Sequence, residues 1–176
     1  EKQNTIAKVP GTIYLTASSL KMKTGQSTTA FKATGFSEGD YVTAVTSNKP
    51  GTVKVTNVNK NGTFKLAAGK KKGSAVVTVT LASKKTASFK VTVQKAAVKT
   101  TKITTTTKSL TLAKGATYKK LASSIAVTPV TSKEKVTYSS SNKKVATVSS
   151  KGVIKAKKAG TAKITVKSGS KKVVVT

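Results

Sequence analysis

The chain has 176 residues, enough for one domain or for two small ones. Its 34 basic residues are all lysines and face only 4 acidic ones, so the formal net charge is +30 at pH 7. With no cysteine and no histidine, the sequence excludes disulfides, thiol or imidazole catalysis, and metal sites built on nitrogen or sulfur, and we predict no cofactor and no metal.

An internal repeat organises the chain. Residues 12–25 (TIYLTASSLKMKTG) match residues 102–115 (KITTTTKSLTLAKG) at an offset of 90. Further matches join Ser-Asn-Lys at 47–49 to 141–143, and KKKGSAVVTVT at 70–80 to KKAGTAKITV at 157–166. We therefore predict two domains, 1–95 and 96–176. Their linker, KAAVKTTK at 95–102, has no Gly or Pro, so we expect it to be short and partly strand-like.

Each half shows the two-residue alternation of half-buried strands. Apolar residues alternate along 75–81 and 87–93 in the first half and along 162–166 in the second, and glycines mark turns between the runs. About seven short strands in each half predict two β-sandwiches in an all-β protein. Only LASSIAV, at 121–127, is predicted to be a short helical or irregular turn.

The segment from Val136 to Gly169, VTYSSSNKKVATVSSKGVIKAKKAGTAKITVKSG, closely resembles the bacterial Ig-like group 2 domain. Tyr138 stands where that family usually has a tryptophan. The first half is a diverged copy, which lacks that aromatic residue and has a longer hairpin before Phe64. The predicted core of the second half comprises Val145, Val148, Ile154, Ile164 and Val166. The resemblance implies an exported module, often in tandem, of the kind found in bacterial adhesins and in some phage structural proteins.

The carboxylates do not indicate an enzyme. Glu38 and Asp40, on either side of Gly39, are better explained by a solvated turn than by a calcium loop or an acid and base pair, because calcium needs six or more oxygen ligands. A Lys–Asn isopeptide bond assisted by Glu38, Asp40 or Glu134 is disfavoured, because none of these acids lies in an apolar run. We therefore predict a non-catalytic protein.

The lysines carry the remaining functional signal. Both halves place a cluster in the same inter-strand turn, before Gly73 and before Gly160; the clusters are Lys70, Lys71, Lys72, Lys157 and Lys158. Two interpretations stay open at this point. Clustered ammonium groups attract anionic polymers such as teichoic acid, acidic polysaccharide, mucin or lipid headgroups, and lysines on exposed strands also keep a protein soluble and protect sheet edges from aggregation.

Specific nucleic acid binding is not predicted, because the chain has no arginine for guanine contacts and no aromatic cluster for base stacking. Four tyrosines could form a platform for sugar rings, but scattered tyrosines in sandwiches are more often half-buried; they are Tyr14, Tyr41, Tyr118 and Tyr138.

The chain has no apolar run of about 18 residues and no signal-peptide core, so no transmembrane segment is predicted. Because it begins at Glu1 and ends on an apolar run, we expect a monomeric piece of a longer, processed protein, extracellular and secreted or attached to the cell wall, in keeping with a Gram-positive envelope. The predicted function is that of a spacer and adhesive module that contacts anionic cell-wall or host glycans. The alternatives are a carbohydrate-binding accessory module of a secreted glycan-active enzyme and a phage virion decoration domain.

Overall fold

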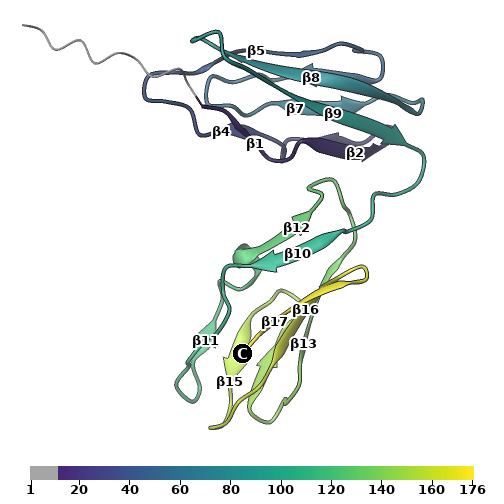
Figure 1. The fold of residues 1–176 in the computed structure, drawn as a ribbon. Helices are drawn as coiled ribbons and strands as arrows, with labels where there is room; N and C mark the ends of the chain where they lie inside the picture. The colour runs from purple at the N-terminus through teal and green to yellow at the C-terminus, as the bar shows by residue number, and fades with distance from the viewer. Residues whose placement is uncertain (1–11) are drawn as a thin grey trace, which may run out of the picture. The chain divides into compact units, whose positions relative to one another are not determined.

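The computed structural model describes residues 12–176, and the chain divides into two compact units between Ala97 and Val98. We call residues up to Ala97 unit 1 and residues from Val98 unit 2, and each is described by itself. Both units are all-β, which confirms the predicted fold class (Figure 1).

The described part of unit 1, residues 12–97, contains nine strands in three sheets. A four-stranded sheet has the order β2-β9-β8-β5, a three-stranded sheet the order β3-β7-β6, and β1 pairs with β4. The strands are β1 (Tyr14–Leu15), β2 (Ser19–Lys23), β3 (Ser27–Thr28), β4 (Ala33–Thr34), β5 (Val42–Ser47), β6 (Val53–Thr56), β7 (Lys65–Ala68), β8 (Gly73–Leu81) and β9 (Thr86–Gln94).

The core of unit 1 follows from the alternation of apolar residues along β8 and β9. Alternate side chains point to opposite faces of a strand, and the inward set on β9, Phe89, Val91 and Val93, is buried. Phe31 stacks on Phe89 with ring centroids 4.1 Å apart, and Phe64 lies 6.2 Å from Phe89. A three-ring cluster therefore fills the space between the two larger sheets.

The strand β2 pairs with β9 in parallel, while the other pairings in this sheet are antiparallel. The paired residues run from Ser19 opposite Lys90 to Lys23 opposite Gln94. Leu20 and Met22 point inward from β2 and are buried. The sheet thus holds the beginning of the domain against its end.

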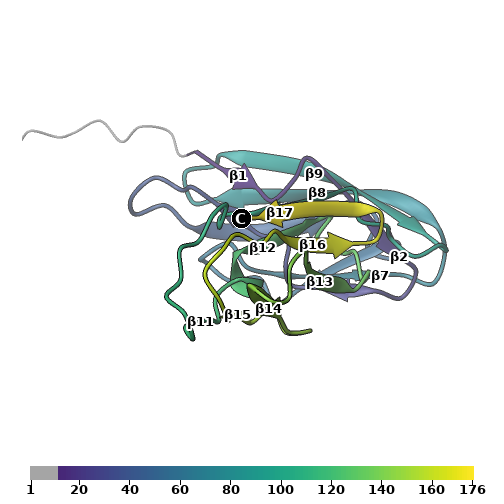
Figure 2. The same ribbon diagram turned by 90° about the horizontal axis from the view of Figure 1, so that it is seen from below.

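Unit 2 contains eight strands in three sheets, with the orders β13-β16-β17, β11-β15-β14 and β10-β12. Figure 2 shows β16 between β13 and β17. The elements are β10 (Lys102–Thr105), β11 (Thr117–Tyr118), a 3-10 helix (Ala122–Ser124), β12 (Ile125–Thr128), β13 (Val136–Ser140), β14 (Ala146–Val148), β15 (Ile154–Ala156), β16 (Ile164–Ser168) and β17 (Lys171–Val175). The 3-10 helix confirms part of the short helical or irregular turn predicted over 121–127, but the last three residues of that segment belong to β12.

The core of unit 2 contains aliphatic residues where unit 1 has three phenylalanines. Ile154, Ile164 and Val166 are buried as predicted, and Leu121 and Val175 join them. The other two predicted core residues, Val145 and Val148, are half-buried.

Strand pairings show that the two units share one plan. The sheet β3-β7-β6 of unit 1 corresponds to the sheet β11-β15-β14 of unit 2. The strands β9-β8-β5 correspond to β17-β16-β13, and the pair β1-β4 corresponds to the pair β10-β12. The strand β2 has no counterpart among the strands of unit 2, because its sequence match, 109–113, is not in a sheet.

The predicted linker, 95–102, spans the division between the units. Its last residue, Lys102, begins β10. Thr100 and Thr101 are already hydrogen bonded to residues of unit 2, the second through its N–H to the Thr128 carbonyl at 2.8 Å.

Candidate functional site

The two lysine clusters lie in equivalent turns. Lys70–Lys72 separate β7 from β8, and Lys157 and Lys158 lie between β15 and β16. The strand register shows that these turns are equivalent. Val77 pairs with Phe89 in unit 1, and Ile164 pairs with Val175 in unit 2. If these two pairs are superposed, Gly73 corresponds to Gly160.

All five lysines of these clusters are exposed, and none is in an ion pair within residues 12–176. The backbone of the second turn is held in place, because Val145 accepts hydrogen bonds from the amides of Lys157 at 2.7 Å and Lys158 at 3.2 Å. Both turns therefore present free ammonium groups, and the second presents them from a fixed backbone. Such groups attract polyanions through charge and counterion release, without a shape that selects one polymer.

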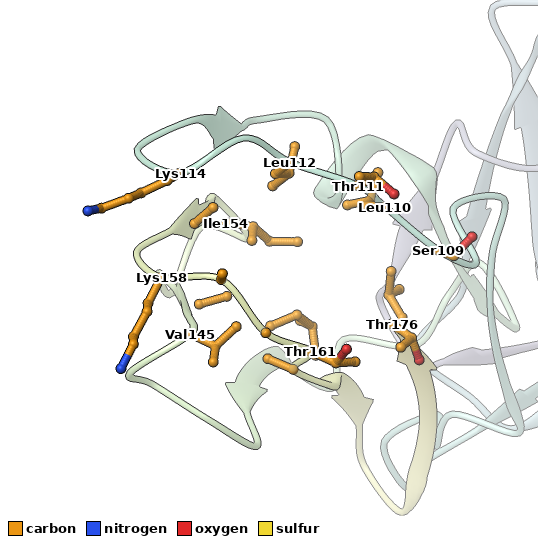
Figure 3. A pocket seen from close by; sticks show the side chains of 17 residues that line it. Ser109, Leu110, Thr111, Leu112, Lys114, Val145, Ile154, Lys158, Thr161 and Thr176 are labelled. Carbon is orange, nitrogen blue, oxygen red and sulfur yellow. The ribbon is translucent and has the colours of Figure 1, made fainter.

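Unit 2 has an apolar groove with a volume of about 530 Å³ (Figure 3). The segment 109–112 lies along one side and Thr161 on the other, and the lining also includes Ile154 and Ile164. Lys114 and Lys158 extend outward on the same side, and Thr176 lies at the opposite end. Leu110 and Leu112 are only half-buried, although the corresponding residues of unit 1, Leu20 and Met22, are buried.

The acidic side chains support turns and strand ends. Asp40 accepts hydrogen bonds from the Ser83 amide at 3.1 Å and from its hydroxyl, which braces the turn between β8 and β9. Glu38 and Gly39 form a turn of their own, in which Glu38 is exposed, whereas Asp40 is half-buried. Of the described residues, no three His, Cys, Asp or Glu side chains are grouped so as to hold a metal ion.

Glu134 anchors the start of unit 2. Its Oε2 accepts the Thr100 N–H at 2.7 Å, and its Oε1 lies 3.4 Å from the Lys99 ammonium. The Thr100 hydroxyl shares hydrogen bonds of 2.8 Å with the hydroxyls of Ser132 and Ser168. The backbone hydrogen bond from Thr100, more than the neighbouring Lys99 charge, lowers the pKa of Glu134 from its usual value.

The tyrosines have separate structural tasks. Tyr118 and Tyr138 are half-buried against the core of unit 2, and desolvation raises the pKa of Tyr138. Tyr14 and Tyr41 are exposed; the ring of Tyr14 covers Gly35, and the Lys60 ammonium lies 5.0 Å from the centroid of Tyr41. Within unit 2, the two tyrosines thus pack against the core.

Comparison with protein families gives a match to one unit. Residues 99–176 match the model of the bacterial Ig-like domain (group 2). That match supports a domain of this family in unit 2. The matched segment begins within the linker predicted from the sequence, and it contains the second lysine turn and the groove.

Comparison with individual proteins gives short or distant matches. A segment of 38 residues is 68% identical to kappa-carrageenase of Pseudoalteromonas carrageenovora and covers 22% of this chain and 10% of that protein. A structure of domains 4–9 of the surface layer protein SbsC is 20% identical, with 95% of this chain and 31% of that chain covered and a TM-score of 0.46. Domains 5–6 of the same protein are 19% identical over 93% of this chain and 95% of that chain, with a TM-score of 0.43. The chain thus spans about a tenth of the enzyme and about a third of the longer SbsC structure.

The structure also shows a feature that sequence reasoning missed. The repeat matches Leu110 and Leu112 to Leu20 and Met22 of β2, but the segment 109–113 does not form a strand. Of residues 12–176, no helix is long and apolar enough to cross a membrane.

Proposed function

We propose that the chain is a non-catalytic structural and adhesive part of an exported bacterial surface protein, in which two tandem Ig-like modules act as a spacer. The family match of residues 99–176 and the shared plan of the two units support this proposal. We assign unit 1 to the same family as a diverged copy, because its sheets repeat the order and register of unit 2.

The adhesive part of the proposal rests on one observation, the matched lysine turns. Two copies of the fold that differ widely in sequence both present unpaired ammonium groups at the turn before β8 and its counterpart before β16. Lysine gives charge without planar, bidentate recognition, so the expected ligands are anionic cell-wall or host glycans held by charge density.

The test is retention of the 176-residue chain on purified cell wall, mucin and a neutral glycan over a salt series. A variant with Lys70, Lys71, Lys157 and Lys158 changed to Gln is compared with a control in which four other exposed lysines are changed; these are Lys84, Lys85, Lys119 and Lys120. Both variants lose the same formal charge, so the comparison isolates position.

If the turns form a binding surface, the first variant loses about tenfold or more in affinity for one polyanion near physiological salt, and the control loses much less. Equal losses in the two variants would show that the lysines act as a general coat, and the modules would then be spacers alone.

One observation favours a second candidate, an accessory module of a secreted glycan-active enzyme. A short segment of this chain is highly identical to part of kappa-carrageenase, and this match supports a role beside a glycan-active enzyme. We therefore add kappa-carrageenan to the polymers tested. Retention on this polymer that persists in high salt favours the accessory module, because charge attraction alone is screened there.

A further inference from the structure

Two lysines of unit 2 stand opposite each other on the outer face of the β13-β16-β17 sheet. Lys167 of β16 is the register partner of Lys172 of β17, and both are exposed. Lys167 lies between Val166 and Ser168, which are both buried, so its side chain points away from the core. Direct partners on one face of a sheet have Cβ atoms about 4.5–5.5 Å apart, so the register holds two positive side chains close together.

The fold does not require a lysine at either position. In the superposition that relates the lysine turns, Lys167 and Lys172 correspond to Thr80 and Thr86 of unit 1, which are also register partners. Threonine favours strands, whereas like charges directly opposite each other destabilise a sheet. Unit 2 therefore has a repulsive pair where unit 1 has a neutral and more favourable one.

No acidic side chain of unit 2 neutralises this lysine pair. Glu134 is the only acidic residue from Val98 to Thr176. Its carboxylate is already used, because its oxygens lie 2.7 Å from the Thr100 amide and 3.4 Å from the Lys99 ammonium. Neither lysine of the pair is in an ion pair within residues 12–176. The pair therefore keeps its full repulsion until an anion from outside unit 2 binds.

A hydroxyl group lies on the other side of Lys167. Thr137 of β13 is its register partner there and is exposed, and β16 runs between β13 and β17 (Figure 2). A row across the three strands thus presents one hydroxyl and two ammonium groups, which are all hydrogen-bond donors. An oxyanion above this row would accept charge-assisted hydrogen bonds and would replace the repulsion between the ammonium groups with two attractions.

We propose that Thr137, Lys167 and Lys172 form an anion-binding site for a sulfate ester or phosphate monoester group of a polymer. Such a group has three terminal oxygen atoms for the three donors, whereas a carboxylate has two. Because the row is exposed, a single group is held weakly, and a polymer that carries many such groups is the expected ligand. The site shares no residue with the lysine turns and goes beyond the function proposed for them.

The experiment measures the affinity of the 176-residue chain for three dextrans that carry sulfate, phosphate monoester or carboxymethyl groups on the same backbone. The pair variant, Lys167→Thr with Lys172→Thr, introduces the residues of unit 1. The control, Lys102→Thr with Lys155→Thr, removes the same charge from exposed strand lysines whose register partners are threonines. For the sulfated or the phosphorylated dextran, the pair variant should lose about tenfold in affinity and the control about twofold or less. In low salt, the pair variant should also unfold at a higher temperature than the control, because the repulsion is removed.

Three results would overturn the proposal. Equal losses in the pair variant and the control would leave only a general coat of lysines. Losses in Lys167→Thr and Lys172→Thr alone that add up to the loss of the pair variant would show that no anion is shared, because a shared anion makes each single loss nearly as large as the double one. An equal loss for carboxymethyl dextran would exclude a preference for three terminal oxygens. The lysine turns are intact in all these variants, so a failure here is distinguishable from a failure of the proposed adhesive function.

Discussion

Unit 1 and unit 2 have the same strand plan but different interiors. In unit 1, three stacked phenylalanine rings and a complete four-stranded sheet close the core. In unit 2, aliphatic residues form the core, and the sheet that corresponds to this one has three strands beside an open groove. The comparison teaches that the plan depends on the pattern of alternation and turns, while the identity of the core residues can vary widely.

The largest expected effect separates the two cores. Phe89 and Val175 occupy equivalent positions, the first within the aromatic cluster and the second at the end of the groove. Phe89→Ala should destabilise unit 1 by about 3–5 kcal/mol, since it removes a ring that contacts two others. Val175→Ala should cost unit 2 roughly 2 kcal/mol, because fewer buried methyl groups are lost. Calorimetry that resolves the unfolding of each unit measures both, and equal losses would contradict the difference between the cores.

A second comparison concerns the glycine at the tip of each hairpin, between β6 and β7 and between β14 and β15. Gly62 and Gly152 occupy the same turn, with φ of 90° and 78°. Alanine costs about 1–2 kcal/mol at either site from the left-handed backbone alone. At Gly62 a Cβ would lie 2.0 Å from the Ala33 carbonyl oxygen, whereas at Gly152 it would meet the Tyr138 ring at 2.9 Å.

A side chain can move aside more readily than the backbone carbonyl of a paired strand. Gly62→Ala should therefore destabilise its unit more than Gly152→Ala does. Urea unfolding followed by hydrogen exchange in each unit provides the measurement, with Gly25→Ala as a control in open space at φ of 76°. A larger loss at Gly152 would show that the Tyr138 ring is held more rigidly than the strand.

The smallest effect concerns pH. Because the pKa of Glu134 is lowered in the folded chain, its charged form stabilises unit 2 at pH values above the ordinary value of 4.5. That stabilisation should be lost as the pH falls through the lowered pKa. In Glu134→Gln the loss should be absent, since glutamine does not titrate. Thermal unfolding of both proteins between pH 7 and pH 2 tests this, and parallel curves would contradict it.

The alternation of apolar residues was enough to predict the fold class and many of the strands. β8 and β9 follow the predicted faces, and the longer hairpin before Phe64 is also confirmed, since eight residues separate β6 from β7 and five separate β14 from β15. Alternation is a local property that burial on one face enforces. The exposure of the lysine turns could also be predicted, because charged residues in turns remain hydrated.

Features that depend on distant partners could not be predicted in this way. The stacking of Phe31 on Phe89 joins residues from separate strands, and the hydrogen bonds of Thr100 with Ser132 and Ser168 join the linker to two later segments. Likewise, the segment 109–113 has the pattern of a strand but lacks a neighbour to pair with along most of its length. The exact alignment of the two halves could not be predicted either. The Asn48 amide donates to Val76 and the Ser141 amide to Lys163, so Asn48 corresponds to Ser141. The sequence match of 47–49 with 141–143 is therefore displaced by one residue from the alignment in the structure.

The parallel pairing of β2 with β9 has a mechanical consequence. A force that pulls the beginning of β2 and the end of β9 apart acts along the strands, so that the hydrogen bonds between them are stretched together in shear. Shear of this kind breaks several bonds in one step, whereas peeling breaks them one at a time. Unit 1 should therefore resist tension applied at these two points more strongly than tension that peels β2 away from β9.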